Sequence, residues 1–367
     1  MKFAMSLLAF RPGLIGGAET YVRQFIAHLG AALGADRFVL VAHRDNAGAV
    51  PIPPGVEQVV VDRSDRQIVR LRAMEAFTPL RARGLEKVFR KIAPDAVFFP
   101  QQSLFPKALP MPSVMTVVDV QHLYFPKNFA FADRMFRATI YAYSLRRAAR
   151  IVAISEFTRK CLIDKCAVPP ERVVAVPFGL SHRDTAALAP TGRIAGPYLY
   201  YPAATFPHKG HATLLRTFAT LKRRGLPHRL VLTGKRTEHW PALEALIASL
   251  GIGADVIHPG FLPFDEVMRI YKGADAIVFP TLFEGFGLPV TEAVEFGKKV
   301  ITSRLEVFDE IGVPRQWQID FADPDQLAAA LSLPGPTRLE KPLGDWSQNV
   351  KATLDLLRQA ADERKSR

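Results

Sequence analysis

The sequence predicts an α/β protein with two doubly wound domains, each built on a parallel sheet. Short apolar runs and helical periodicities alternate along the whole chain, which is the pattern that parallel strand–helix units produce. The chain has 367 residues, too many for one compact core, so two domains are expected. Residues 182–197, rich in Ala, Pro, Thr and Gly, interrupt the alternation midway and predict the linker.

The strand candidates are short apolar runs bounded by turn residues. In the first half they are residues 2–9, 38–42, 58–61, 96–99, 113–118, 151–154 and 173–176. In the second half they are residues 198–201, 229–232, 255–258, 275–279 and 299–302. Helical stretches such as residues 19–33 and 66–92 lie between them. We therefore predict a first domain over residues 1–185 and a second over residues 186–344.

The C-terminal tail has the spacing of an amphipathic helix. From Asp345 onward, apolar side chains recur at Val350, Leu354 and Leu357, so that they share one helical face. We predict a helix over residues 345–367 that packs back on the first domain.

The net charge of +13 is concentrated in the first half. Residues 1–185 hold 26 Lys and Arg against 15 Asp and Glu, whereas the remainder holds 22 against 20. The basic residues cluster in residues 63–91 and 127–150. Nucleic acid, an anionic membrane surface and an anionic substrate are the possible partners. Because no nucleic-acid-binding motif accompanies the charge, we favour peripheral attraction to a membrane and expect no nucleic acid.

Cysteine usage and hydropathy favour a cytoplasmic protein. The two cysteines, Cys161 and Cys166, are five residues apart in a predicted helix. They point to different faces, so neither a disulfide nor a zinc site is indicated. The apolar start at residues 3–10 fits a first strand better than a signal peptide, and no run approaches the ~20 apolar residues of a spanning helix. We expect location in the cytoplasm, at the inner face of the cell membrane.

The most informative local pattern is residues 279–293, Phe-Pro-Thr-Leu-Phe-Glu-Gly-Phe-Gly-Leu-Pro-Val-Thr-Glu-Ala. Its two glycines allow a sharp turn after a buried strand, and Pro289 fits the first position of a helix. Glu292 is then expected in the first helical turn and Glu284 in the loop before it. A helix N-terminus attracts an anion such as a diphosphate, and each carboxylate can accept two hydrogen bonds from a sugar diol. The pattern predicts a nucleotide-sugar site, although acidic residues also begin ordinary helices.

Lys209 is predicted to be the counter-charge in this site. It stands in residues 201–211, Tyr-Pro-Ala-Ala-Thr-Phe-Pro-His-Lys-Gly-His, where a strand ends in a loop close to a helix start. A lysine there offers a point charge to a diphosphate and stabilises a leaving group as its negative charge develops. A solvated surface lysine is the alternative.

Two loops of the first half complete the candidate set. Gly16 and Gly17 lie between the first strand and a helix, a pattern that also fits a plain tight turn. It is not the Gly-x-Gly-x-x-Gly fingerprint, which argues against an NAD enzyme. Asp119 and His122 follow another strand, at the sheet edge where ligands of parallel sheets bind. They are predicted to line the sugar or the acceptor, with ordinary packing of His122 as the alternative.

These blocks, spread over nearly the full length, resemble the retaining glycosyltransferases of family 4. That family has two Rossmann-like domains facing across a cleft, the GT-B fold. Glu284 and Glu292 match its Glu-x7-Glu pattern, and the Pro-His-Lys form at Lys209 is similar to the branch with many mannosyl- and rhamnosyltransferases. The chain departs from the family at Ala203, where many members have arginine, and at Val118, where they have histidine.

The resemblance implies a role for each matching residue. Glu292 holds the nucleotide ribose, Glu284 contacts hydroxyls of the donor sugar, and Lys209 stabilises the departing diphosphate. We assign the catalytic set to Lys209, Glu284, Asp119 and His122. The donor-binding set, which supplies backbone groups and pocket walls, comprises Gly16, Gly17, Thr233, Gly234, Lys235, Phe261, Phe286, Gly287, Leu288 and Glu292.

The implied activity is metal-independent transfer of a hexose with retained configuration. The donor is a nucleotide diphosphate sugar, with GDP-mannose as the guess, and no other cofactor is implied. The acceptor is a hydroxyl of a growing polysaccharide, lipopolysaccharide or glycolipid. Two alternatives stay open, a sugar-nucleotide epimerase of the same architecture and a non-catalytic glycan-binding protein.

Overall fold

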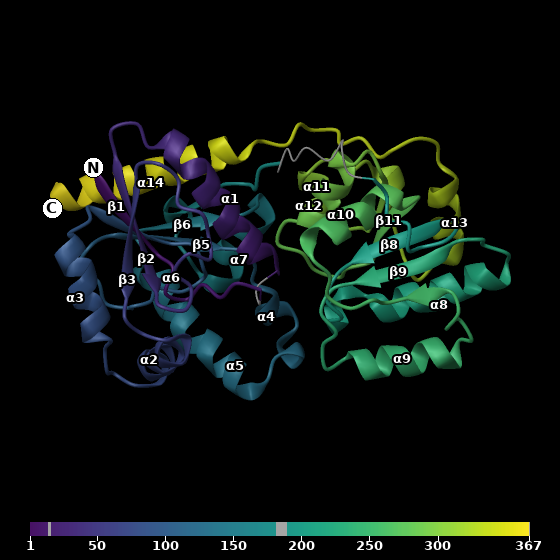
Figure 1. The fold of residues 1–367 in the computed structure, drawn as a ribbon, viewed down its shortest axis with the longest axis horizontal. Coiled ribbons are helices and arrows are strands. Elements are labelled where there is room, and N and C mark those ends of the chain that lie inside the picture. The colour runs from purple at the N-terminus through teal and green to yellow at the C-terminus, as the bar shows by residue number, and fades with distance from the viewer. Residues whose placement is uncertain (14–15, 181–188, 367) are drawn as a thin grey trace. The chain divides into compact units, whose positions relative to one another are not determined.

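A computed structural model describes residues 1–13, 16–180 and 189–366. The chain divides into two compact units, one of Met1–Gly179 and Gly344–Arg367 and the other of Leu180–Leu343 (Figure 1). The predicted boundary at residues 185 and 186 lies outside the described residues, and so do residues 14 and 15 of the glycine loop.

The first unit contains a seven-stranded sheet in the order β3-β2-β1-β4-β5-β6-β7. Every pair of neighbouring strands is parallel. The strands are β1 Lys2–Ser6, β2 Arg37–His43, β3 Val56–Val61, β4 Ala96–Phe99, β5 Ser113–Val117, β6 Arg150–Ala153 and β7 Val173–Ala175. The chain starts at the middle of the sheet, runs to one edge and then fills the other side, as in a doubly wound fold.

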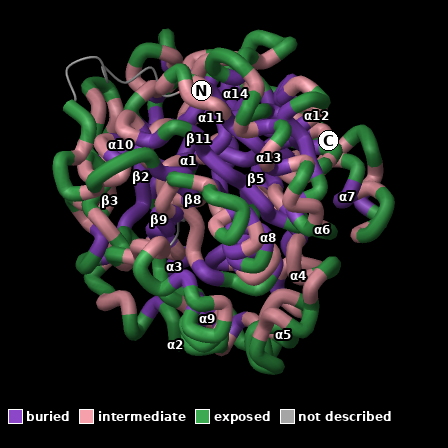
Figure 2. Tube along the Cα trace, turned by 90° about the vertical axis from the view of Figure 1, so that its right-hand side faces the viewer, coloured by how far each residue is buried: buried purple, intermediate pink, exposed green. Residues whose placement is uncertain are grey.

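Helices connect these strands and cover the sheet. They are α1 Gly16–Ala32, α2 Asp65–Phe77, α3 Arg83–Ile92, α4 Gln121–Tyr124, α5 Phe131–Phe136, α6 Ala142–Arg147, α7 Glu156–Cys166 and α14 Trp346–Lys365. A π-helical turn, η2 Arg137–Tyr141, joins α5 to α6. The central strands β1, β2, β4, β5 and β6 are mostly buried, whereas the edge strand β3 has no buried residue. Helices such as α2 and α5 carry many exposed residues (Figure 2).

The predicted helix over residues 66–92 is wrong, because the structure has two helices there. Ser64 caps α2 by accepting from the Gln67 N–H, and the helix ends at Phe77. Pro79 follows within two residues, and proline disfavours the helical conformation in the residue before it. The chain resumes as α3 after a five-residue break, residues 78–82.

The C-terminal helix α14 packs on α1 and on β4, β5 and β6 of the first unit. Trp346 at its start is fully buried and stacks on Phe178, with ring centroids 5.3 Å apart. Backbone of α14 comes so close to Gly179 that a Cβ there would lie 2.1 Å from Trp346 N. Further along the helix, Arg358 pairs with Asp36 over 2.8 Å. These contacts attach the tail to the first sheet.

The second unit contains a six-stranded parallel sheet in the order β10-β9-β8-β11-β12-β13. Its strands are β8 Tyr198–Pro202, β9 Arg229–Thr233, β10 Val256–Ile257, β11 Ala276–Phe279, β12 Lys299–Ser303 and β13 Gln318–Ile319. Its helices are α8 His211–Arg223, α9 Trp240–Ser249, α10 Phe264–Gly273, α11 Leu288–Glu295, α12 Glu306–Glu310 and α13 Pro324–Ser332. The predicted fold class, two doubly wound parallel sheets, is confirmed.

Strand β13 was not predicted from the sequence. This strand has only two residues, one of them Gln318, so it offers no apolar run to detect. In the part of the chain that the structure describes, no helix has the length and apolar character needed to cross a bilayer.

Candidate active site

The loop between β11 and α11 carries Glu284 and ends at Gly287. Gly287 has φ of 100°, and a Cβ there would lie 2.9 Å from Phe308 Cε1, so the turn requires glycine. The helix begins one residue before Pro289, and its first turn contains no acidic residue. The prediction that Glu292 lies in the first turn is therefore wrong, since the glycine turn starts the helix earlier than the proline suggested.

Lys209 and Glu284 form an ion pair, with Lys209 Nζ 2.5 Å from Glu284 Oε1. Lys209 ends the short 3-10 turn η4, Pro207–Lys209, that follows β8. The next residue, Gly210, has φ of 72°, and a Cβ there would lie 2.1 Å from Pro280 O. This close approach of backbone to backbone holds the two loops together. The side chains of Lys209 and Glu284 are 19% and 13% exposed, so the pair is partly shielded from solvent yet open to a ligand.

Glu292 is oriented by a buried tyrosine of α10. The Tyr271 hydroxyl lies 3.3 Å from Glu292 Oε2 and 3.2 Å from Pro289 O. The ring of Tyr271 stacks on Phe296, with centroids 5.7 Å apart. Burial raises the pKa of Tyr271 well above its ordinary value, so the phenol remains a hydrogen-bond donor. Tyr271 was not among the predicted site residues, because nothing in the sequence of α10 distinguishes it from an ordinary core residue.

Residues Thr233, Gly234 and Lys235 lie at the carboxyl end of β9. Thr233 is buried, and its hydroxyl is 2.6 Å from the hydroxyl of a tyrosine on β8. Gly234 has φ of 119°, and a Cβ there would lie 2.8 Å from the carbonyl carbon of Ala203. The Thr205 N–H donates to Lys235 O over 3.1 Å. The β9 loop therefore packs directly on the segment that leads to Lys209.

The segment after β10 exposes Phe261, of which 74% is accessible. Near it, Arg236 Nη2 donates to His258 O over 2.6 Å, and its guanidinium carbon lies 4.6 Å from the ring centroid of Trp240. Burial lowers the pKa of His258 to about 4, so this imidazole is neutral at pH 7. Arg236 was not among the predicted site residues, although its position next to Lys235 at the end of a strand could have indicated it.

In the first unit, Gly16 and Gly17 begin α1. The N–H groups of a first turn have no acceptor within the helix, so the backbone suits the predicted anion contact. Glu19 lies in the same turn, however, and its Oε2 accepts from the Gly13 N–H over 2.6 Å. It also pairs with Arg23 over 2.7 Å. The helix start therefore already carries an anion of its own.

Asp119 and His122 line one cavity of about 510 Å³ in the first unit. Burial, with a smaller effect of the nearby Arg137, lowers the pKa of His122 to about 4. The neutral ring packs edge-on against Tyr141, with centroids 5.5 Å apart. Most of the other lining residues are apolar: Val117, Val120, Leu123, Ala138, Ala142, Leu145, Leu162, Ala167, Val168 and Pro169. The structure thus brings the two predicted residues together in a pocket with largely apolar walls.

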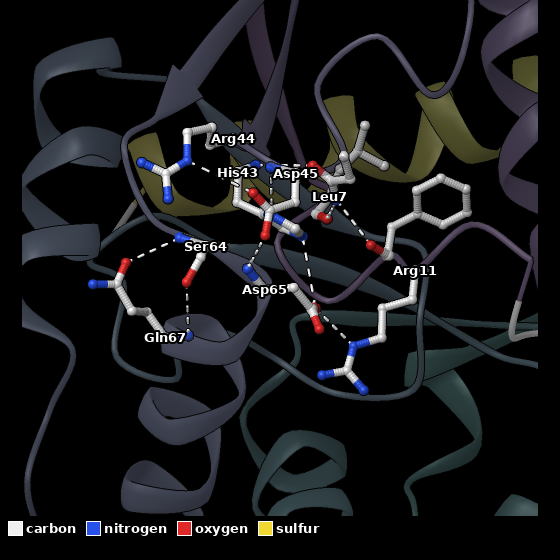
Figure 3. Close-up of polar contacts among 10 residues, drawn as sticks. Leu7, Arg11, His43, Arg44, Asp45, Ser64, Asp65 and Gln67 are labelled. Atoms are coloured by element: carbon white, nitrogen blue, oxygen red, sulfur yellow. Dashed lines mark hydrogen bonds and ion pairs between the residues drawn. The ribbon is translucent and has the colours of Figure 1, made fainter.

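A polar network near the carboxyl ends of β1 and β2 was not anticipated (Figure 3). His43 is buried, and its Nδ1 accepts from the Asp45 N–H over 3.2 Å. Burial lowers the pKa of His43, so the neutral ring carries its proton on Nε2, which lies 3.9 Å from Asp65 Oδ1. The same oxygen accepts from Arg11 Nε over 2.8 Å. The network fixes the loop after β1. A histidine directly after the apolar residues of β2 was the one indication of it in the sequence.

Two family models match the chain, one in each unit. Residues 15–183 match the model described as Glycosyltransferase Family 4, and residues 194–333 match the one described as Glycosyl transferases group 1. The chain belongs to the family 4 glycosyltransferases. The predicted membership is confirmed.

The curated relatives of this glycosyltransferase include mannosyltransferases. The MMP alpha-(1->4)-mannosyltransferase of Mycolicibacterium hassiacum is 31% identical over 208 residues, which are 54% of this chain and 49% of that protein. The O-antigen chain mannosyltransferase RfbU of Salmonella typhimurium is 22% identical over 228 residues, 59% of this chain and 62% of that protein. The chain thus spans less than two thirds of the length of either relative.

Solved structures with the same fold cover nearly the whole glycosyltransferase. Sucrose-phosphate synthase from Thermosynechococcus elongatus has a TM-score of 0.66 at 15% identity, over 100% of this chain and 98% of that one. HepE of Anabaena, in complex with UDP and glucose, has a TM-score of 0.62 at 16% identity over 100% of both chains. WaaG, a glycosyltransferase of lipopolysaccharide biosynthesis, has a TM-score of 0.60 at 16% identity over 98% of both chains. These similarities confirm the predicted GT-B fold.

Proposed function

We propose that this glycosyltransferase moves a hexose from a nucleotide diphosphate sugar to a hydroxyl of a growing polysaccharide, lipopolysaccharide or glycolipid. The observation that carries the proposal is the ion pair of Lys209 and Glu284, at the carboxyl ends of β8 and β11. The lysine supplies a point charge for the diphosphate, and the carboxylate accepts hydrogen bonds from hydroxyls of the sugar. Glu292, oriented by Tyr271, holds the ribose.

The chemistry follows from where charge develops. When the sugar departs, negative charge accumulates on the phosphate that leaves, and a preorganised cation at that point lowers the barrier. Lys209 is that cation. The N-termini of α8 and α11 follow directly after Gly210 and Gly287, and they add positive potential from their free N–H groups. These groups do the work of a metal ion, so the transfer is metal-independent.

We infer that the anomeric configuration is retained. Glu284 is engaged by Lys209 over 2.5 Å, which suits a carboxylate that contacts the donor rather than one that attacks the anomeric carbon. In the front-face route, the acceptor hydroxyl attacks from the side of the departing phosphate, and that phosphate takes its proton. No enzyme nucleophile is then required.

The cavity with Asp119 and His122 is the proposed acceptor site. The carboxylate of Asp119 is a hydrogen-bond acceptor for a sugar hydroxyl. His122 is neutral at pH 7, because its pKa lies at about 4, so it can bind a hydroxyl without attracting a phosphate. The cavity also borders four cationic side chains: Arg137, Arg146, Lys165 and Arg172. This combination suits an acceptor with both an anionic group and an apolar portion.

The donor we propose is GDP-mannose. The support is the Pro-His-Lys form of the Lys209 loop and the similarity to two mannosyltransferases. The proposed location is the cytoplasm, at the inner face of the cell membrane, where lipid-linked acceptors are accessible. The basic first half of the chain supports that location.

Release of nucleoside diphosphate tests the proposal. The purified protein is incubated with a panel of nucleotide sugars, with and without lipid-linked acceptors. We expect release from one donor that depends on the acceptor, with GDP-mannose the most active. If no donor released nucleoside diphosphate, the proposed transferase activity would be wrong. Interconversion of the nucleotide sugar without acceptor would indicate an epimerase, and glycan binding without turnover would indicate a binding protein.

A further inference from the structure

Helices α2 and α5 of the first unit lie side by side at one end of that unit (Figure 1). Phe77 on α2 and Phe136 on α5 make an edge-to-face contact, with ring centroids 6.4 Å apart. We call the exposed residues of 66–91 and 126–135 the α2–α5 surface. It includes residues of α2, of the break after it, of α3 and of α5. The proposed donor and acceptor residues all lie outside these ranges.

The α2–α5 surface exposes large apolar side chains. Phe131 on α5 is 76% exposed and Met135 is 41% exposed. Phe77 at the end of α2 is 53% exposed, and Leu80 in the following break is 59% exposed. Single exposed apolar residues are ordinary, but these four stand on two helices in contact and the break between α2 and α3. Their grouping indicates a surface that would be stabilised by contact with an apolar partner.

The charge around these side chains is almost entirely positive. Residues 66–91, all of which the structure describes, contain seven exposed cations and no exposed carboxylate. The cations are Arg66, Arg70, Arg81, Arg83, Lys87, Arg90 and Lys91. On the α5 side, Lys127 and Arg134 are also exposed, together with Asp133.

The two acidic residues of 66–91 are buried, and each is already engaged. Glu75 accepts from the Ala82 N–H over 2.8 Å and from the Lys107 N–H over 2.9 Å. Glu86 pairs with Arg81 over 2.6 Å. Both carboxylates therefore hold the break between α2 and α3 in place. Glu86 thus compensates Arg81, and the other six cations of residues 66–91 keep the surface positively charged.

We propose that the α2–α5 surface docks on an anionic lipid bilayer, with its cations at the headgroups and its apolar side chains in the interface. The negative surface potential of an anionic membrane attracts cationic side chains. Shallow insertion of exposed aromatic and aliphatic side chains removes apolar surface from water and adds to the free energy of binding. Two of the four exposed apolar side chains, Leu80 and Met135, have no ring for stacking on bases, and the ring of Phe77 already contacts Phe136, which favours lipid over nucleic acid. Docking brings the enzyme to a lipid-linked acceptor, so the purpose of the surface rests on the proposed function.

Cosedimentation with vesicles tests the docking. The full chain is mixed with vesicles of phosphatidylcholine containing 30% phosphatidylglycerol, or of phosphatidylcholine alone, at low and high NaCl. We expect binding to the anionic vesicles, weaker binding at high salt and little binding to the neutral ones. The double variant Lys87→Glu/Arg90→Glu should weaken partitioning roughly 25-fold or more, at about fivefold for each lost cation. Phe131→Ser and Leu80→Ser should each weaken it several-fold.

Matched variants on the same unit separate a local surface from general charge. Lys351→Glu/Arg364→Glu removes two exposed cations from α14, and Ile52→Ser removes an apolar side chain that is 39% exposed. Both should bind vesicles like the wild type, and thermal melts should show every variant folded. Equal losses in test and control variants, or wild-type binding to single-stranded RNA but not to vesicles, would overturn the proposal. Vesicle binding needs neither donor nor acceptor, so it can fail while the transferase assay succeeds.

Discussion

Lys209 and Glu284 are 75 residues apart in the chain, yet their charged groups lie 2.5 Å apart. In the absence of donor, each charge neutralises the other. A donor must therefore compete for both, with its diphosphate drawing on the lysine and its sugar hydroxyls on the carboxylate. This relationship predicts that the two side chains affect binding and turnover in different ways.

Removing each charge should separate the two roles. Lys209→Met should weaken binding of the nucleoside diphosphate roughly tenfold or more, because a hydrogen bond to a charged group contributes about 1.5–3 kcal/mol. Glu284→Gln frees the lysine, so diphosphate affinity should be kept or raised while kcat for sugar transfer falls. Calorimetry with nucleoside diphosphate and steady-state kinetics make the comparison. Equal losses of diphosphate affinity in both variants would contradict these roles.

Glu292→Ala should weaken nucleotide binding roughly tenfold through loss of the ribose contacts. Tyr271→Phe removes the hydroxyl that lies 3.3 Å from Glu292 Oε2, and it should give a smaller loss with kcat little changed. The control is Glu295→Ala, an exposed carboxylate on the same helix, which should bind nucleotide like the wild type. Unchanged affinity in Glu292→Ala would show that the ribose lies elsewhere.

Gly287→Ala should destabilise the second unit and reduce activity together. Its φ of 100° costs an L-residue about 1–2 kcal/mol, and the added Cβ would meet Phe308 at 2.9 Å. Gly253→Ala is the matched control, because a Cβ at Gly253 meets nothing within 4 Å. Urea unfolding measures the difference. A Gly287→Ala protein as stable as the control would mean that the turn accommodates a side chain.

The fold could be predicted from the sequence because local signals agree with it. Apolar runs such as 96–99 lie in the buried centre of a parallel sheet, and their length and spacing suffice to predict strands. The wrong predictions concern helix boundaries that a single residue determines. Pro79 breaks a periodicity that otherwise continues through residue 92, and the turn at Gly287 moves the start of α11 by one residue.

Residues of the candidate site could be predicted only where they belong to a recognisable sequence motif. Glu284 and Lys209 stand in recognisable blocks, and their contact then depends on packing of Gly210 against Pro280. The supporting residues leave no such signal. Tyr271 is one buried aromatic among many in the core, and its contact with Glu292 exists only once α10 packs beside α11.

The two buried histidines close to Lys209 in the chain, His208 and His211, should make the stability of the protein depend on pH. Burial, with a smaller effect of the Lys209 charge, lowers the pKa of His208 to about 3. Burial likewise lowers the pKa of His211 to about 3. In the unfolded chain each titrates near 6.5, so below that pH the unfolded state binds protons that the folded state does not. Stability should therefore be fully present above about pH 6.5 and fall as the pH drops toward the folded values.

Each histidine should lower the free energy of unfolding at pH 5 by about 2 kcal/mol relative to pH 7. Urea unfolding of the full chain between pH 7 and 5, above the range in which most carboxylates titrate, measures the loss. His211→Gln removes one titrating group, so it should be less stable than the wild type at pH 7 because its ring contact with Tyr201 at 4.7 Å is lost. Its stability should nevertheless fall less steeply with acid. If stability fell with pH as steeply as in the wild type, His211 would be protonated in the folded protein at pH 5, which would contradict its lowered pKa.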